Sequence, residues 1–374
     1  LCGAWLALVA TPASAYGPPR YGGDVTAALP SRPLTLDPTR MERLGEWQLA
    51  LLLYDGLMRV ERQGRAPKPH LASSVVTLGR LKRRVHITLR HGVRTHRGHR
   101  LTAADVLASL RRLHKSRQGW VLATVSRMRT RGTHRLELTL VRSCPELPMV
   151  LASPPASILP RGLPPGRAPD GTGAFRFVRG RAGGPMRLSS FAWHFGGRPY
   201  VDSVTLVPYR RYRDEISAFY LGRSLVSFRG KRVFGRRPGF TTRRLRSPAV
   251  TTMALLTGGQ GAVVDRRVRQ ALYLAINKRR LRQLVTGAPT RAAHGPVPPV
   301  LLGRRARRRA RAPAPHRPQR ARALLATAAA HPTVAGARLS DGTIGVSLLV
   351  DRSRHRDMDA ARKIMADLAN VGIR

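Results

Sequence analysis

Acidic residues, lysine, cysteine and aromatic residues are all scarce in this chain of 374 residues. The sequence holds 19 Asp and Glu against 68 Lys and Arg, which gives a formal net charge of +49. The carboxylates are few and separated, so their spacing in the sequence indicates no acid–base pair for catalysis. Only 6 of the 68 basic residues are lysine. The scattered arginine excess is more typical of compositional drift than of selected phosphate contacts, although such a surface attracts polyanions.

The densest basic run, Arg304 to Arg322, contains nine arginines, three prolines and no acid. This composition predicts a solvated loop. Aromatic residues make up 5% of the chain and none lies in the run, so the bases of a nucleic acid would find no stacking platform there. The sequence therefore predicts no specific nucleic-acid partner.

Residues 1–15 form a short apolar stretch that ends in Ala13-Ser14-Ala15, the small-x-small pattern that a signal peptidase accepts. Pro12 argues against a buried helix. We expect a partial export signal and a periplasmic or cell-envelope location, and no later stretch is long enough to span a bilayer. Cys2 lies in this signal, so Cys144 is the one cysteine expected in the mature chain and no internal disulfide can form. Lipid anchoring stays open.

Apolar periodicity predicts a mixed α/β fold. Alternation at 85–89, 136–140 and 204–206 is typical of half-buried strands, and 25–29 is a further strand candidate. Helical spacing predicts helices at 42–53, after a Thr102–Asp105 capping box, after Asp265, from Asn277 to Thr286, and at 357–371.

Catalytic motifs are absent from the sequence: it has no GxSxG elbow, HExxH pair or Walker loop. Cys144 has no nearby His to activate it, so we predict no catalytic residue and no enzyme. Gly171-Thr172-Gly173 lacks the third glycine of a dinucleotide fingerprint and predicts a tight turn into a strand.

Four histidines at 86, 91, 96 and 99 are the strongest metal candidate. However, His86 faces away from the apolar residues of its strand, and no Cys, Asp or Glu lies among the four. We favour polar loop residues and predict no metal site and no cofactor.

The order of the segments carries the functional information. GGDVTAALPSRPLTLDP, LYDGLMRV and ITLRHGVRTHRGHRLTAADVLASLRRL resemble the amino-terminal half of bacterial extracellular solute-binding proteins of family 5. The resemblance continues in order through GTGAFRFV, RPYVDSVTLVPY, VRQALYLAINKRRL, VPP and DLANVGI. Members of this family are the peptide-, nickel- and related binding proteins of ABC importers.

The resemblance implies a two-lobed periplasmic-binding-protein fold of class II, with mixed α/β sheets and flanking helices that close over a ligand. We expect a partial signal at 1–15, a first lobe with its smaller subdomain at 16–250, and a second lobe at 251–374. The expected export signal lacks an initiator Met and a basic start, and family members continue beyond the position of Arg374. We therefore expect a chain truncated at both ends, with an incomplete second lobe.

By the same resemblance, the protein captures a small ligand, with a short peptide favoured, and delivers it to an ABC permease in the inner membrane as a monomer. The candidate ligand contacts are Thr35, Leu36, Asp37, Tyr54 and Thr257. Each has a structural alternative: Asp37 before Pro38 is typical of a turn, and the ring of Tyr54 suits the core beneath its helix.

Two other functions stay open. One is a drifted, strongly cationic paralogue without a transport role, which adheres to anionic envelope polymers. The other is a cytosolic nucleic-acid-binding regulator that contains a solute-binding domain, against which the expected export signal argues.

Overall fold

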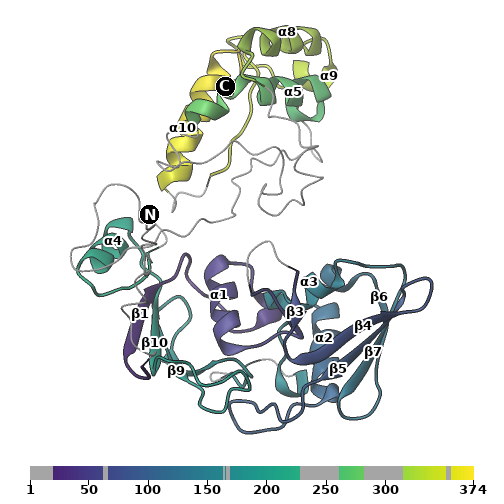
Figure 1. Ribbon diagram of the computed structural model, residues 1–374. Helices are drawn as coiled ribbons and strands as arrows, with labels where there is room; N and C mark the ends of the chain where they lie inside the picture. The colour runs from purple at the N-terminus through teal and green to yellow at the C-terminus, as the bar shows by residue number, and fades with distance from the viewer. Residues whose placement is uncertain are drawn as a thin grey trace, which may run out of the picture. The chain divides into compact units, whose positions relative to one another are not determined.

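The computed structural model describes residues 20–61, 66–162, 165, 169–227, 261–281, 315–350 and 355–374 (Figure 1). The chain separates into two compact units, Leu1–Gly230 and Lys231–Arg374. The lobe boundary expected at 250 and the export signal expected at 1–15 lie outside the described residues, so both stay predictions.

The first unit contains a mixed four-stranded sheet in the order β1-β10-β9-β8. Its strands are β1 (Asp24–Ala28), β8 (Phe175–Gly180), β9 (Met186–Ser190) and β10 (Ser203–Val207). β1 runs parallel to β10, and the other neighbours are antiparallel. Helix α1 (Leu44–Leu53) packs into the same apolar core, which includes Leu29, Leu188 and Leu206. The predicted strands at 25–29 and 204–206 are thereby confirmed, with β1 starting one residue earlier.

A second, antiparallel sheet of the same unit has the order β4-β5-β7-β6. Its strands are β4 (Ala72–Leu78), β5 (Arg84–Leu89), β6 (Val125–Thr130) and β7 (Arg135–Leu140). Figure 1 shows helix α2 (Ala103–His114) lying against this sheet. The predicted alternation is confirmed, because Val85, Ile87 and Leu89 are each at most 1% exposed and share a core with Leu110 of α2.

Shorter elements connect these sheets and helices. They are β2 (Met58–Arg59), β3 (Lys68–Pro69), α3 (Leu147–Leu151), α4 (Tyr212–Tyr220) and the 3₁₀ turns Pro38–Arg40, Gly119–Leu122, Pro154–Ala156 and Pro160–Gly162. β2 and β3 pair as a small antiparallel sheet.

Carboxylates fix the starts of the two long helices of this unit. Asp105 accepts hydrogen bonds from the backbone N–H of Thr102 at 2.8 Å and from its hydroxyl at 2.7 Å, so the predicted capping box of α2 is confirmed. Helix α1 begins two residues later than predicted. The Glu46 carboxylate accepts the N–H groups of Glu42 and Arg43, both at 2.9 Å, and holds these two residues outside the helix.

The second unit is built from helices around one apolar cluster. The helices in its described residues are α5 (Arg266–Ala275), α8 (Pro318–Ala328), α9 (Pro332–Ala335) and α10 (His355–Ala369), with a 3₁₀ turn at Ala262–Val264. The cluster includes Val268 and Leu272 of α5, Leu325 of α8 and Leu368 of α10. Among the described residues, no helix is long and apolar enough to cross a membrane.

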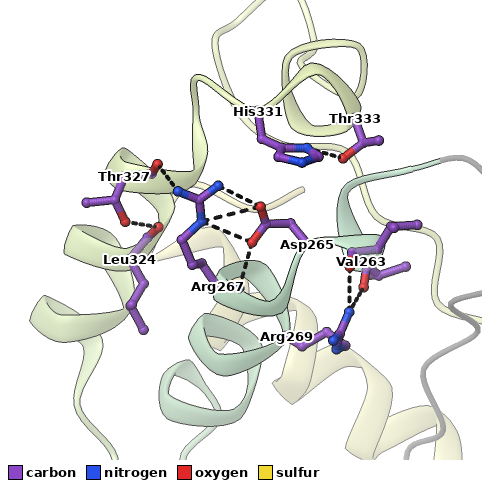
Figure 2. Close-up of polar contacts among 9 residues, drawn as sticks. Val263, Asp265, Arg267, Arg269, Leu324, Thr327, His331 and Thr333 are labelled. Carbon is purple, nitrogen blue, oxygen red and sulfur yellow. Dashed lines mark hydrogen bonds and ion pairs between the residues drawn. The ribbon is translucent and has the colours of Figure 1, made fainter.

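Asp265 caps α5, as predicted. Its carboxylate accepts the backbone N–H of Arg267 at 2.6 Å, and Figure 2 shows the Arg267 guanidinium joining Asp265 to the carbonyl of Thr327 on α8. The hydrogen bond from the Arg267 side chain lowers the pKa of Asp265 to about 2. One cap therefore both starts α5 and ties it to α8.

The basic run is a loop only in part. Its residues up to 314 lie outside the described part of the chain, but helix α8 begins at Pro318, so the loop predicted through Arg322 is wrong at its end. Proline suits the first helical position, and the buried Ala321, Leu325 and Ala328 supply the apolar face that the arginines obscure in the sequence. The helix predicted from Asn277 is described only as far as residue 281, where the Asn277 side chain accepts the N–H of Arg280 at 3.1 Å.

Removing the N-cap hydroxyl tests the structural weight of the α2 capping box. We expect Thr102→Ala to lower the free energy of unfolding by about 1 kcal/mol, because an N-cap hydrogen bond is lost. The control Arg111→Ala, at an exposed position of the same helix, should stay within about 0.5 kcal/mol of the parent chain. Urea denaturation followed by circular dichroism measures both. Equal losses in the two variants would contradict the assignment.

Candidate ligand-binding site

Four of the five predicted ligand contacts lie close together in the first unit. Thr35, Leu36 and Asp37 form the loop after β1, and Tyr54 directly follows α1. The Tyr54 hydroxyl donates to the carbonyl oxygen of Leu36 at 2.8 Å, and the Thr35 hydroxyl accepts the N–H of Asp37 at 3.0 Å. Thr257 lies outside the described residues.

Asp37 is committed to internal partners. Its carboxylate accepts the N–H of Thr39 at 3.0 Å and the Thr39 hydroxyl at 2.8 Å, which caps the 3₁₀ turn at Pro38–Arg40. It also forms an ion pair with Arg112 of α2. One guanidinium nitrogen of Arg112, Nη1, is buried without a hydrogen-bond partner among the described residues. The pair therefore anchors the loop to α2 and leaves one donor unused.

Tyr54 is a core residue in this structure, with 1% of its surface exposed. Burial, reinforced by the charge of Asp37, raises the pKa of its phenol well above the usual range. The hydroxyl therefore stays protonated and acts as the donor to Leu36. This buried position agrees with the alternative that the Tyr54 ring belongs to the core beneath its helix. Contact between Tyr54 and a ligand stays a prediction.

An open pocket of about 830 Å³ lies beside this loop, between it and α2. It is lined by Asp37, Thr39, Arg40, Glu42, Ala108, Arg111, Arg112, Lys115, Ser116, Arg117 and Gln118. Basic residues outnumber acids in this lining, so its potential favours a carboxylate or another anion. Glu42 neutralises little of this charge, because its nearest basic partner, Arg117, is 3.7 Å away and both side chains are more than half exposed.

The turn at residues 170–173 packs against the end of α1, as its two glycines require. A Cβ atom at Gly171 or Gly173 would overlap backbone atoms of Leu52 or Leu53, and the N–H of Gly173 donates to the Leu53 carbonyl at 3.1 Å. The prediction of a tight turn into a strand is confirmed, since β8 starts at Phe175.

The four clustered histidines do not converge, and each has its own surroundings. His86 lies exposed on β5, and the ring of His91 stacks on that of His134 with centroids 4.1 Å apart. His96 Nε2 lies 2.9 Å from the Gly173 carbonyl, and His99 Nδ1 lies 3.4 Å from Asp170. Burial lowers the pKa of His96, against the raising effects of Gly173 and Asp170. These residues therefore do not form one metal site.

A different polar cluster was missed by the sequence analysis. Asp55, His70 and His194 come together in the first unit, where one ligand-type atom from each residue lies within 4.8 Å of the other two. His70 Nε2 lies 2.8 Å from Asp55 Oδ1, and His194 Nε2 lies 3.5 Å from Asp55 Oδ2. No local motif joins three residues so far apart in the sequence, so only the fold identifies the cluster.

Comparison with known proteins gives a family and a fold. The family model described as "Bacterial extracellular solute-binding proteins, family 5 Middle" matches residues 66–374. Among curated relatives, YhjP of Bacillus subtilis is 28% identical over 250 residues, which cover 66% of this chain and 40% of YhjP. The HTH-type transcriptional regulator SgrR of Pectobacterium atrosepticum is 29% identical over 192 residues, which cover 50% of this chain and 34% of SgrR. The chain thus matches well under half of these relatives.

Two solved structures share the fold at low sequence identity. DppA from Helicobacter pylori, an ABC transporter-associated periplasmic binding protein in complex with the peptide STSA, has a TM-score of 0.76 and 18% identity over 95% of this chain and 73% of DppA. The oligopeptide-binding protein AppA from Bacillus subtilis, in complex with a nonapeptide, has a TM-score of 0.73 and 19% identity over 95% of this chain and 74% of AppA. The predicted α/β periplasmic-binding-protein fold, with mixed sheets and flanking helices, is confirmed.

The lowered pKa of His96 makes stability depend on pH. The unfolded chain takes up a proton at the ordinary histidine pKa of 6.5, before the folded chain does. The contribution of His96 is therefore fully present above this pH and is lost as the pH falls through the lower, folded-state pKa. We expect urea denaturation between pH 7.5 and pH 5 to give a shallower fall in stability for His96→Gln than for the parent chain.

The matched control is His114→Gln, at an exposed position near the end of α2. It should keep the pH dependence of the parent chain. A slope unchanged in His96→Gln would contradict the role given to burial.

Proposed function

The chain belongs to family 5 of the bacterial extracellular solute-binding proteins, and on that premise we propose that it is the exported binding component of an ABC importer. The family match over residues 66–374 is the observation that carries this proposal. The protein captures a short peptide, passes it to a permease in the inner membrane, acts as a monomer and changes no covalent bond in its ligand. The lobes expected at 16–250 and 251–374 close on the peptide.

A peptide is the favoured ligand for two reasons. DppA and AppA, which share the fold, were each solved with a bound peptide. In addition, the pocket beside the 35–37 loop presents the charges of Arg111, Lys115 and Arg117, which suit a terminal or side-chain carboxylate. Desolvation of the peptide and hydrogen bonds to its amides would supply the remaining affinity.

Ligand-dependent stabilisation tests the proposal. A peptide present at 100 times its dissociation constant should raise the free energy of unfolding by about 2.7 kcal/mol, because it binds only the folded chain. Pools of peptides of two to nine residues are screened by thermal denaturation in 0.15 M salt, and each hit is confirmed by calorimetry. No stabilisation by any pool would contradict peptide binding.

Two variants with the same change in charge separate the pocket from the general positive charge. Arg111→Gln lies in the pocket lining, and Arg84→Gln lies at an exposed position on β5 outside it. We expect Arg111→Gln to weaken a peptide hit several-fold and Arg84→Gln to leave it unchanged. Equal weakening in both, with complete loss of binding at 0.5 M salt, would favour the cationic paralogue that adheres to anionic polymers.

A second candidate function is the solute-sensing part of a transcriptional regulator. The match to SgrR over half of this chain favours it. The two candidates differ in location, so fractionation of cells that carry the complete gene separates them. We expect the protein in the periplasmic or envelope fraction, and retention in the cytosol would favour the regulator.

A further inference from the structure

Three segments of the first unit bring metal-ligand atoms together around Asp55. Asp55 lies just after α1, His70 just after β3, and His194 between β9 and β10. The Asp55 and His194 side chains are 8% and 6% exposed, and that of His70 is 14% exposed. The cluster is therefore held in the interior and does not depend on mobile surface side chains.

One nitrogen of the His194 imidazole, Nε2, has no hydrogen bond of normal length. Its Nε2 atom has no solvent contact and no hydrogen-bond partner among the described residues. The nearest acceptor, Asp55 Oδ2, is 3.5 Å away, which is too far for a good hydrogen bond. Buried polar atoms are normally satisfied, and an unpartnered one calls for an explanation, such as an ion bound there.

Neighbouring groups hold the side chains of Asp55 and His194 in place. The Thr172 hydroxyl donates to Asp55 Oδ2 at 3.1 Å. His194 Nδ1 lies 3.2 Å from the Gly196 N–H and 3.3 Å from the Gly197 carbonyl. A cation on Nε2 would place the proton on Nδ1, so that Nδ1 donates to the Gly197 carbonyl in place of accepting from Gly196. The Phe195 ring packs on both imidazoles, with centroids 4.9 Å from His70 and 4.6 Å from His194.

We propose that Asp55, His70 and His194 bind one divalent transition-metal ion, with Zn²⁺ the best fit. Two imidazole nitrogens and one carboxylate are a common zinc ligand set, and a water molecule can complete the tetrahedron. Bonds of about 2.0–2.1 Å place ligand atoms roughly 3.3 Å apart around a tetrahedral ion. His70 Nε2 lies 2.8 Å from Asp55 Oδ1, His194 Nε2 lies 3.5 Å from Asp55 Oδ2, and one ligand atom from each of the three residues lies within 4.8 Å of the others. Metal binding would therefore replace the His70–Asp55 hydrogen bond and draw the two imidazoles together.

Such an ion would be a resident part of the fold. It would join the end of α1, the β2–β3 sheet and the turn after β9 at one point. Its presence depends neither on the solute that the protein carries nor on the proposed transport role.

Metal binding by the whole chain tests the proposal. The protein is stripped with EDTA and dialysed, and Zn²⁺ is titrated in competition with a chromophoric chelator. We expect one tight ion per chain, a rise in melting temperature on adding Zn²⁺, and the intense visible absorption of tetrahedral Co²⁺ after cobalt substitution. No stoichiometric ion in the parent chain would overturn the proposal.

Variants locate the ion. His70→Gln and His194→Gln should each weaken Zn²⁺ binding more than tenfold and abolish the cobalt spectrum. The control His91→Gln removes the exposed imidazole pair with His134, which is the competing surface site, and should change neither. Circular dichroism checks that each variant folds. If His194→Gln does not fold, His70→Gln still tests the site, because the His70 side chain is partly exposed. Binding lost in His91→Gln, or kept in both cluster variants, would overturn the assignment.

Discussion

The contact between the end of α1 and the turn at residues 170–173 holds the first unit together. Backbone meets backbone there, because the N–H of Gly173 donates to the carbonyl of Leu53 and neither glycine position has room for a Cβ atom. In the same turn, the Thr172 hydroxyl donates a hydrogen bond to Asp55. The Gly173 carbonyl contacts Nε2 of His96, which lies in the loop after β5 of the second sheet. This close approach, which only glycine permits, is therefore one of the links between the two sheets of the unit.

The remaining acids explain how a chain with a net charge of +49 keeps its fold. Glu46 accepts three backbone N–H groups around the start of α1, and Asp105 and Asp265 cap α2 and α5. Asp170 accepts hydrogen bonds from Thr95 and from the N–H of Arg97. These carboxylates satisfy backbone and hydroxyl donors at helix starts and in loops, most of them partly buried. Loss of surface acids changes the electrostatic field, whereas loss of these acids would break local structure.

Local patterns predicted local structure, and the errors have local causes. Strand alternation and capping residues gave β5, β7, β10, α2 and α5, because each signal lies within one element. The first turn of helix α8 resembles a loop in the sequence, because arginine and proline dominate that stretch while the apolar face of the helix is built mostly from alanine. The cluster at Asp55 could not be predicted, because its members come from three segments that are far apart in the sequence and share no local motif.

The structure shows which partners the candidate ligand residues already bind, and the sequence resemblance alone does not. The side chains of Asp37 and Tyr54 are already occupied, by Thr39 and Arg112 for the first and by Leu36 for the second. Tyr54 is buried, whereas Asp37 lines the pocket together with the exposed Arg111 of α2. Because Arg112 of the same helix is paired with Asp37, this ion pair ties the position of the loop to the helix that carries Arg111.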